Sequence, residues 1–228
     1  MQDHTPPIPL EPSRYTTGDG DAAHAASIAE GARPLGAVTV ARAVTTVVVT
    51  ERLMLRELVD DDLDFVADML ADADVMRFYP KPLTRDESAK WLERQQARYA
   101  TDGHGLWLAV ERESGRPVGQ VGLVMQSIAA VSDAPIPEIG YLLHRPFWGR
   151  GYATEAALGV RAFAFVERRY PAVISLIRPE NGPSQDVARR LGMQVIADTE
   201  YVGLAHRVFQ AEAAHVEHQP QSGGSASG

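Results

Sequence analysis

The segment from Pro137 to Arg169 most constrains how this chain can fold. A strand-like run, Glu138–Leu143, leads through a short loop rich in glycine and arginine into a long stretch with helical periodicity. Small or apolar residues recur there at positions 153, 156, 157, 160, 163 and 164, the spacing of one helix face. A strand, a loop and a helix in immediate succession predict a helix packed against a sheet, and so a mixed α and β fold.

The same two patterns alternate over the rest of residues 46–213. Thr84 followed three residues later by Glu87 is a capping box, which predicts a helix through Tyr99. A Glu-Ser-Gly turn between two β-type runs predicts a hairpin. The predicted strands are Thr46–Glu57, Gly105–Glu111, Pro117–Met125, Glu138–Leu143, Ala172–Ile177, Met193–Tyr201 and Leu204–Ala211, and the predicted helices are Leu63–Leu70, Thr84–Tyr99, Gly151–Arg169 and Ser184–Leu191. The predicted order is β-α-α-β-β-β-α-β-α-β-β, an α/β (α+β) layout.

Both ends of the chain have the composition of tails. Residues 1–45 carry five prolines among Gly, Ala, Asp and Thr, without a sustained period. Residues 214–228 include the Ser-Gly-Gly-Ser run of a flexible linker. We therefore expect a disordered or weakly ordered segment over 1–45, one folded domain over 46–213 and a flexible C-terminal tail.

Composition narrows the functional classes. The net charge of −8 and the lack of a concentrated basic face argue against a nucleic-acid-binding protein. Without cysteine, the chain has no disulfide, cysteine metal site or catalytic thiol. The N-terminus lacks the pattern of a secretory signal, and the apolar segment 37–50 is short and contains Arg42. We expect a cytoplasmic enzyme without a membrane partner.

The loop before the long helix has the features of a phosphate site. Unpaired N–H groups and the positive end of the dipole meet at a helix N-terminus, and this combination binds anions. Gly149 and Gly151 permit unusual backbone angles and close approach, while Arg145 and Arg150 add positive charge. An ordinary strand–turn–helix connection would explain the same residues. The loop matches neither the G-x-G-x-x-G dinucleotide pattern nor a P-loop.

This segment resembles the acyl-CoA-binding motif of the GNAT acetyltransferases, Q/R-x-x-G-x-G/A, which falls here on residues 148–153. The words EIGY, WGRGYATEA and NGPS…LGM are similar to the branch with the ribosomal-protein-alanine N-acetyltransferases, and the likeness spans about residues 48–211. The resemblance implies a mixed, mostly antiparallel central sheet with helices on both faces. Two positions depart from the family pattern: Trp148 replaces the first Gln or Arg, and Ala188 stands where many members have a tyrosine acid.

The resemblance also implies how acetyl-CoA, the expected co-substrate, would bind. The backbone of Leu142 and Leu143 would hydrogen-bond the pantetheine arm, as would Asn181. Arg189 would reach the adenosine phosphates, whereas Arg190 is interpreted as part of a solvated helix face. The pyrophosphate cradle would consist of Arg150, Gly151, Tyr152, Ala153 and Thr154.

Two residues are candidates for the acid–base chemistry of amine acetylation. Glu138, which shares a strand face with Gly140 and Leu142, is the candidate base, through water. Ser184 is the candidate acid that protonates the departing thiolate. Each also has a structural interpretation: Glu138 as a carboxylate that caps a loop, and Ser184 as a first-turn residue of a helix. No metal site is expected, because the histidines lack companions at ligand spacing.

The resemblance also implies an acceptor that is an amine-bearing peptide or small molecule. A protein α-amine has a reference pKa near ~8, against ~10.4 for lysine, and needs little help to become neutral. A site without an obvious strong base therefore favours a protein N-terminal α-amine. A small-molecule amine and a non-catalytic acyl-CoA-binding module are the alternatives. The sequence is compatible with a monomer or a homodimer.

Overall fold

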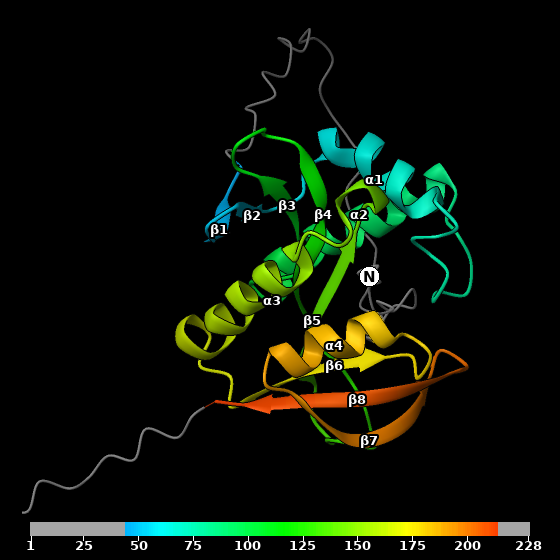
Figure 1. Ribbon diagram of the computed structural model, residues 1–228, viewed down its shortest axis with the longest axis vertical. Helices are drawn as coiled ribbons and strands as arrows, with labels where there is room; N and C mark the ends of the chain where they lie inside the picture. Colours follow the sequence, from blue (N-terminus) through cyan, green and yellow to red (C-terminus); the bar gives the residue numbers. More distant parts are fainter. Residues whose placement is uncertain (1–43, 214–228) are drawn as a thin grey trace, which may run out of the picture.

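One sheet of eight strands organises the protein, with helices on both of its faces (Figure 1). The computed structural model describes residues 44–213, so the expected tails lie outside the described residues except for positions 44 and 45. The strand order is β1-β2-β3-β4-β5-β6-β8-β7. Neighbouring strands are antiparallel except for β5 and β6, which run parallel. The mixed, mostly antiparallel sheet expected from the resemblance is confirmed.

The elements follow the predicted order closely. They are β1 Thr46–Val49, β2 Leu53–Arg56, the 3-10 turn η1 Asp60–Asp62, α1 Leu63–Ala71, α2 Arg85–Thr101, β3 Leu106–Glu111, β4 Pro117–Gln126, β5 Ile136–Leu143, the 3-10 turn η2 Arg145–Phe147, α3 Tyr152–Ala162, the π-helical turn η3 Phe163–Glu167, β6 Ala172–Ile177, α4 Gly182–Arg190, β7 Gln194–Tyr201 and β8 Leu204–Glu212.

Two predicted elements differ from the structure. The single strand Thr46–Glu57 is in fact the hairpin of β1 and β2. Thr50 closes its turn, since its N–H donates to the Leu53 carbonyl at 2.9 Å and its hydroxyl accepts from the Leu53 N–H at 3.0 Å. Threonine is also a common strand residue, which hides this turn in the sequence. The predicted helix Gly151–Arg169 changes to π-helical geometry at Phe163.

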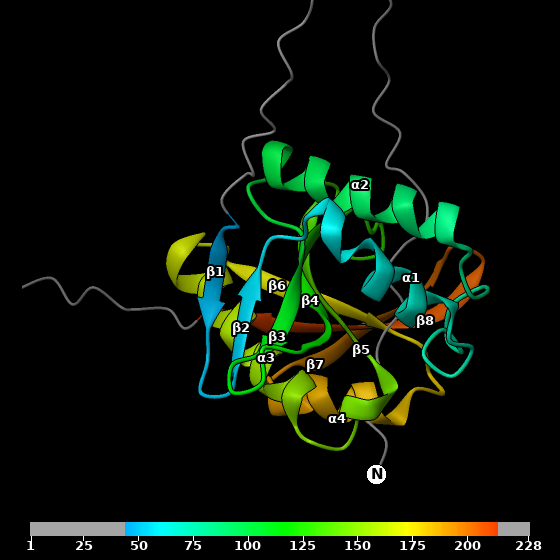
Figure 2. The ribbon, with the colours of Figure 1, turned by 90° about the horizontal axis from the view of Figure 1, so that it is seen from above.

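The two sheet faces are covered by different helices (Figure 2). Trp107, Val121 and Tyr141 lie side by side on β3, β4 and β5, and the Trp107 ring packs edge-on against Phe163 just after α3. Side chains alternate between faces along a strand, so the even-numbered residues of β4 and β5 point to the other face. There α1 and α2 cover the sheet, and Gln95 of α2 accepts a hydrogen bond from the Leu106 N–H at 3.2 Å.

The parallel strands β5 and β6 form a fork. Within the described residues, the two strands pair at Glu138 and Ile174. Beyond this pair they separate, although β5 continues to Leu143 and β6 to Ile177, and we call the gap between them the fork. Side chains satisfy backbone groups at this point: the Ser175 hydroxyl donates to the Ile139 carbonyl at 2.8 Å, and the Leu176 N–H donates to Glu138 Oε1 at 3.2 Å. The separation continues toward the loop that leads to α3.

Over residues 44–213, no helix combines the length and apolar character needed to cross a bilayer.

Candidate active site

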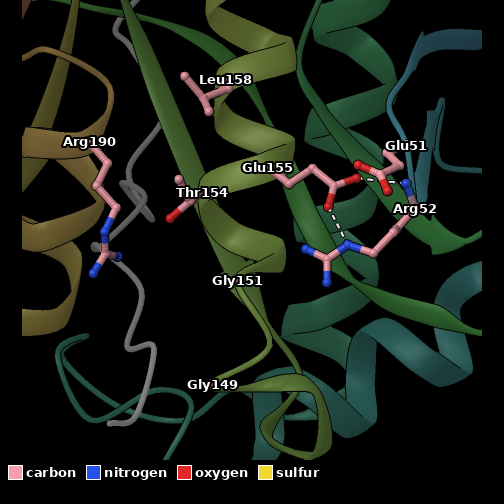
Figure 3. A pocket seen from close by; sticks show the side chains of 8 residues that line it. All are labelled: Glu51, Arg52, Gly149, Gly151, Thr154, Glu155, Leu158 and Arg190. Atoms are coloured by element: carbon pink, nitrogen blue, oxygen red, sulfur yellow. Dashed lines mark hydrogen bonds and ion pairs between the residues drawn. The ribbon is translucent and has the colours of Figure 1, made fainter.

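A cavity of about 720 Å³ lies at the N-terminus of α3 (Figure 3). Gly151 is the N-cap of α3 with φ 76°, and Gly149 has φ 74°. Both angles are in the left-handed region, where glycine avoids the penalty that a Cβ would bring. A Cβ on Gly151 would meet only Arg52 Nη2, at 3.6 Å, so the constraint there is the backbone angle. The cavity is lined by Glu51, Arg52, Gly149, Gly151, Thr154, Glu155, Leu158 and Arg190.

An arginine outside the recognised sequence motifs, Arg52, holds this end of α3. Arg52, in the β1–β2 turn, donates to Glu155 from its backbone N–H at 2.7 Å and from Nε at 2.6 Å (Figure 3). Its Nη1 donates to the Arg150 carbonyl at 3.0 Å, and its guanidinium lies over the Tyr152 ring, 4.6 Å from the centroid. We call these contacts the Arg52 clasp. It fixes the loop backbone and the first turn of α3 to the edge of the sheet.

Glu155 is ionised in this clasp. Burial alone would raise the pKa of Glu155, but hydrogen bonds from Thr50 and Arg52 outweigh burial and lower it. The arginine side chain is 45% exposed and that of Glu155 17%, so solvent screens part of the interaction. The Glu155 charge is therefore neutralised by Arg52 at the place where an anionic ligand would approach.

The cavity fits the diphosphate of a coenzyme A molecule. Thr154 Oγ1 is buried at its wall and has no hydrogen-bond partner in the structure, which is costly for a polar atom unless a ligand or water supplies one. The first N–H groups of α3 point the same way, and Arg190 adds a positive charge from α4. An orphaned hydroxyl, helix-end donors and a cation together are suited to phosphate oxygens.

The two arginines of α4 lie in different surroundings. Arg189 donates to Asp186 Oδ1 at 2.7 Å and to Gln185 Oε1 at 3.2 Å, and it is absent from the cavity wall. Arg190 lines the cavity instead. The geometry therefore favours Arg190 over Arg189 for the coenzyme, because α4 turns its last residue toward α3.

The rest of the predicted cradle surrounds the same helix end. Gly151 and Thr154 line the cavity, while the side chains of Tyr152 and Ala153 are buried beneath α3. Arg150 is exposed, and its guanidinium lies 5.3 Å from the centre of the Phe147 ring. At the start of α3, Arg150 therefore contributes its backbone groups rather than the charge of its guanidinium.

Backbone alternation separates the two leucines expected at the pantetheine arm. The His144 N–H donates to the Val118 carbonyl of β4, so Leu142, two residues earlier, also turns its backbone groups to β4. Leu143 and Tyr141 turn theirs toward the fork. The geometry therefore favours Leu143, with Tyr141, over Leu142. Trp148 Nε1 donates to the Leu143 carbonyl at 2.8 Å, which ties the loop to the end of β5.

Asn181 and Ser184 meet at the start of α4. Asn181 is the N-cap, and its Oδ1 accepts from the Ser184 N–H at 3.2 Å. Both residues are fully buried. The Tyr141 hydroxyl donates to the Ser184 carbonyl at 2.9 Å, which links β5 to α4 across the fork. The helix start is thus built as expected for a first-turn serine, and the pantetheine and acid roles stay predictions.

Glu138 is fully buried where the fork begins. Its two oxygens accept from the Leu176 N–H at 3.2 Å and from Gln126 Nε2 at 2.7 Å. Burial raises the pKa of Glu138 to about 7, although the Leu176 and Gln126 hydrogen bonds and the Arg98 charge lower it. A carboxyl group with this pKa can accept or release a proton near neutral pH. Both of its sequence-based interpretations therefore remain open, as a base and as a cap of the fork backbone.

Gln120 is a second buried polar side chain on the face of Glu138. It lies on β4 in register with Leu142, and it is fully buried with neither amide atom hydrogen-bonded in the structure. An unpaired buried amide costs roughly 1–3 kcal/mol for each group left unsatisfied. Nothing local in the sequence marks Gln120, because its environment is made by neighbouring strands.

The histidines fit structural roles. His104 is buried, with Nδ1 at 3.1 Å from the Leu123 carbonyl and Nε2 at 2.8 Å from the Tyr170 hydroxyl. Nε2 of His144 lies 3.5 Å from Oδ2 of Asp68. The described part of the chain holds no group of three or more His, Cys, Asp or Glu able to bind a metal ion. Trp91 and Trp107 are core residues.

Known proteins share this architecture. The family model described as an acetyltransferase (GNAT) domain matches residues 52–194. The chain belongs to the GNAT acetyltransferase family. The uncharacterized protein YkkB of Bacillus subtilis (strain 168) is 35% identical over 149 residues, 65% of this chain and 85% of YkkB.

Solved structures agree with this membership. An acetyltransferase of Agrobacterium tumefaciens str. C58 has a TM-score of 0.63 at 27% identity, covering 74% of this chain and 94% of its own. RimL, a ribosomal L7/L12 α-N-protein acetyltransferase in complex with coenzyme A, has a TM-score of 0.61 at 16% identity, covering 74% and 98%. At that identity, the likeness to RimL shows the fold alone.

Proposed function

We propose that this GNAT protein transfers the acetyl group of acetyl-CoA to a primary amine, with a protein N-terminal α-amine as the acceptor. The observation that carries the proposal is the Glu138 carboxyl group, which is fully buried at the fork with hydrogen bonds from Leu176 and Gln126. The α3 cavity supports the choice of coenzyme, through Thr154 and the helix-end N–H groups. RimL, which shares the fold, is named for action on a protein α-amine.

The pKa of Glu138 bears on which amine the site can use. An α-ammonium has a pKa near 8, so moving its proton to a base of pKa about 7 costs about 1 kcal/mol. A lysine ammonium, with a pKa near ~10.4, would cost about 5 kcal/mol. A buried carboxyl of this strength therefore suits an α-amine better than an unperturbed lysine.

Each residue would have a separate task in the reaction. Bound acetyl-CoA would supply the acetyl group as an activated thioester. Glu138 would take a proton from the α-ammonium, through water because the carboxyl is buried, and the neutral amine would then attack the thioester carbonyl and release its second proton to water as the amide forms. Ser184 would provide a proton to the sulfur as the C–S bond breaks. Backbone N–H groups of β5 at the fork would stabilise the negative charge on the acetyl oxygen.

Two measurements test the proposal in order. Acetyl-CoA at 100 times its dissociation constant should stabilise the folded protein by about 2.7 kcal/mol, seen as a higher unfolding temperature. Thiol release should then be faster with a peptide carrying a free N-terminus than with its N-blocked, lysine-containing counterpart. The chain has no cysteine and adds no thiol background.

The remaining candidates give different results in the same assay. A small-molecule acetyltransferase would release thiol with polyamines, aminoglycosides or amino acids and ignore the peptides. A non-catalytic acyl-CoA-binding module would show the thermal shift without turnover of any amine. No thermal shift with acetyl-CoA or longer acyl-CoAs would contradict the proposal as a whole.

A further inference from the structure

Three side chains from three strands form a hydrogen-bonded line behind the fork. Gln126 of β4 donates from Nε2 to Glu138 Oε2 at 2.7 Å. The Tyr201 hydroxyl, at the end of β7, donates to Gln126 Oε1 at 3.2 Å. Gln126 is 5% exposed and Tyr201 half-buried. Neither residue belongs to the motifs that indicate coenzyme binding.

The chemistry of the partners fixes the direction of this line. A carboxylate only accepts hydrogen bonds, so the NH₂ group of Gln126 must face Glu138 and its carbonyl oxygen must face away. The Tyr201 hydroxyl is a donor at that oxygen and opposes rotation of the amide. With the Leu176 N–H on Oε1, both carboxylate oxygens are held from known directions.

A strained hairpin turn brings Tyr201 to this place. Tyr201 pairs with Leu204 across a two-residue turn in which Val202 has φ 52° and Gly203 has φ 73°. Two positive φ values define the turn that suits a twisted hairpin, yet a β-branched residue such as valine is strained there. The Tyr201 ring also packs edge-on against His206, 6.0 Å between centroids. The tyrosine therefore has a defined position despite its distance from Gln126 in the sequence.

We propose that Gln126 and Tyr201 are positioning residues for Glu138. Tyr201 fixes the orientation of the Gln126 amide, and that amide fixes the orientation of the Glu138 carboxyl group and favours its ionised form, which accepts protons. This inference rests on the proposed function, in which Glu138 is the base. Gln126 and Tyr201 need not touch the substrate. Their effect is on the direction and the proton affinity of the carboxylate.

The electrostatic surroundings predict the sign of the effect. Burial raises the pKa of Glu138, and Gln126, Leu176 and Arg98 of α2 oppose that rise. Arg98 is the charged side chain that faces the group from α2, Tyr201 comes from β7, and His206 of β8 reaches the line through the Tyr201 ring. Removal of the Gln126 donor takes away one of the interactions that lower the pKa of Glu138, while the effect of burial stays, so this pKa should rise above about 7.

The experiment titrates the Glu138 carboxyl directly in full-length protein labelled with ¹³C-glutamate, by NMR. Glu138→Gln identifies the signal by its loss. In Gln126→Met the titration midpoint should rise by about one pH unit, the size expected for one hydrogen bond to a charged group. Tyr201→Phe should raise it by less, because its bond to Gln126 is longer. The acidic limb of the kcat/KM profile should move by the same amount in each variant.

Tyr170→Phe is the matched control. Like Tyr201→Phe, it removes a tyrosine hydroxyl from a partly buried hydrogen bond, here the one to His104, and it should leave the Glu138 titration where it is in the unmodified protein. An unchanged titration in Gln126→Met, with normal acetyl-CoA affinity, would overturn the positioning role alone. Full activity of Glu138→Gln across pH would overturn the base assignment and this inference with it. If Gln126→Met fails to fold, Tyr201→Phe carries the same test, and an unmoved midpoint and acidic limb there would overturn the positioning role.

Discussion

The N-terminus of α3 and the fork between β5 and β6 are two polar sites built in different ways. At α3, a short loop offers backbone donors, and the charged side chains around it are partly exposed. At the fork, the carboxyl of Glu138 and the amide of Gln126 are buried among strands. Exposed charges are screened by water, whereas burial raises the free-energy cost of an ionised group. A charge change at α3 should therefore alter the free energy of unfolding only slightly, whereas a change at the buried Glu138 should alter both the free energy of unfolding and the proposed chemistry.

The largest effect is expected at the fork, in the dependence of stability on pH. The pKa of Glu138 is about 7 in the folded protein, against an ordinary value of 4.5. Between pH 4.5 and pH 7 the folded state therefore binds more protons than the unfolded state. The free energy of unfolding should then fall as pH rises from 5 to 8, by on the order of 3 kcal/mol from this group. Glu138→Gln should flatten that fall in urea titrations at each pH. Parallel curves for the two proteins would mean that burial does not perturb this carboxyl.

Gly151→Asp should weaken acetyl-CoA binding on the order of 100-fold, because its carboxylate would face the diphosphate at the helix end. Gly151→Asn is the control, since asparagine tolerates the left-handed angle of this position without adding charge. Isothermal titration of both variants separates charge from backbone strain. Equal affinity of the Asp variant and the unmodified protein would remove the phosphate assignment from this loop.

Gln120→Met should stabilise the protein by about 1–2 kcal/mol, because it removes an unpaired buried amide while keeping the volume. Chemical denaturation measures the change, and acetyl transfer to the peptide measures what the amide contributes to function. We expect activity to fall while stability rises, as at a site that keeps a costly polar group for a ligand. A loss of stability instead would show that the amide is paired, through a bound water molecule.

The smallest effect is expected at the Arg52 clasp. Glu155→Gln should cost about 1 kcal/mol at pH 7, a modest value because Arg52 is nearly half exposed. The pKa of Glu155 is lowered in the folded protein, so its contribution is present above the ordinary carboxyl pKa and is lost as pH falls through the folded value. Thermal unfolding of the two proteins at pH 7 and at acid pH should converge. A constant difference across pH would assign the effect to packing.

Predictions from the sequence succeeded where the signal is local. The capping box of α2 is present as predicted, with the Glu87 N–H donating to Thr84 Oγ1 at 3.3 Å and the Thr84 N–H to Glu87 Oε2 at 2.9 Å. The loop glycines have the predicted unusual angles. The roles of Leu142 and Arg189 stay predictions, and the geometry favours Leu143 and Arg190 instead, because backbone alternation along a strand and rotation around a helix differ between adjacent residues. A motif identifies the segment that contacts a ligand, but a shift of one residue along a strand or helix changes which side chain or backbone group faces it.

Local sequence patterns predicted the order of elements, the glycine loop before α3 and the resemblance to an acetyltransferase family, since these depend on residues close together in the chain. The Arg52 clasp and the hydrogen-bonded line of Tyr201, Gln126 and Glu138 exist only in the folded chain. Arg52 meets Glu155 across 103 positions of sequence, and Tyr201 meets Gln126 across 75. Such pairs form only when the order and register of the strands are set, and burial of the whole sheet, rather than any local preference, fixes that register.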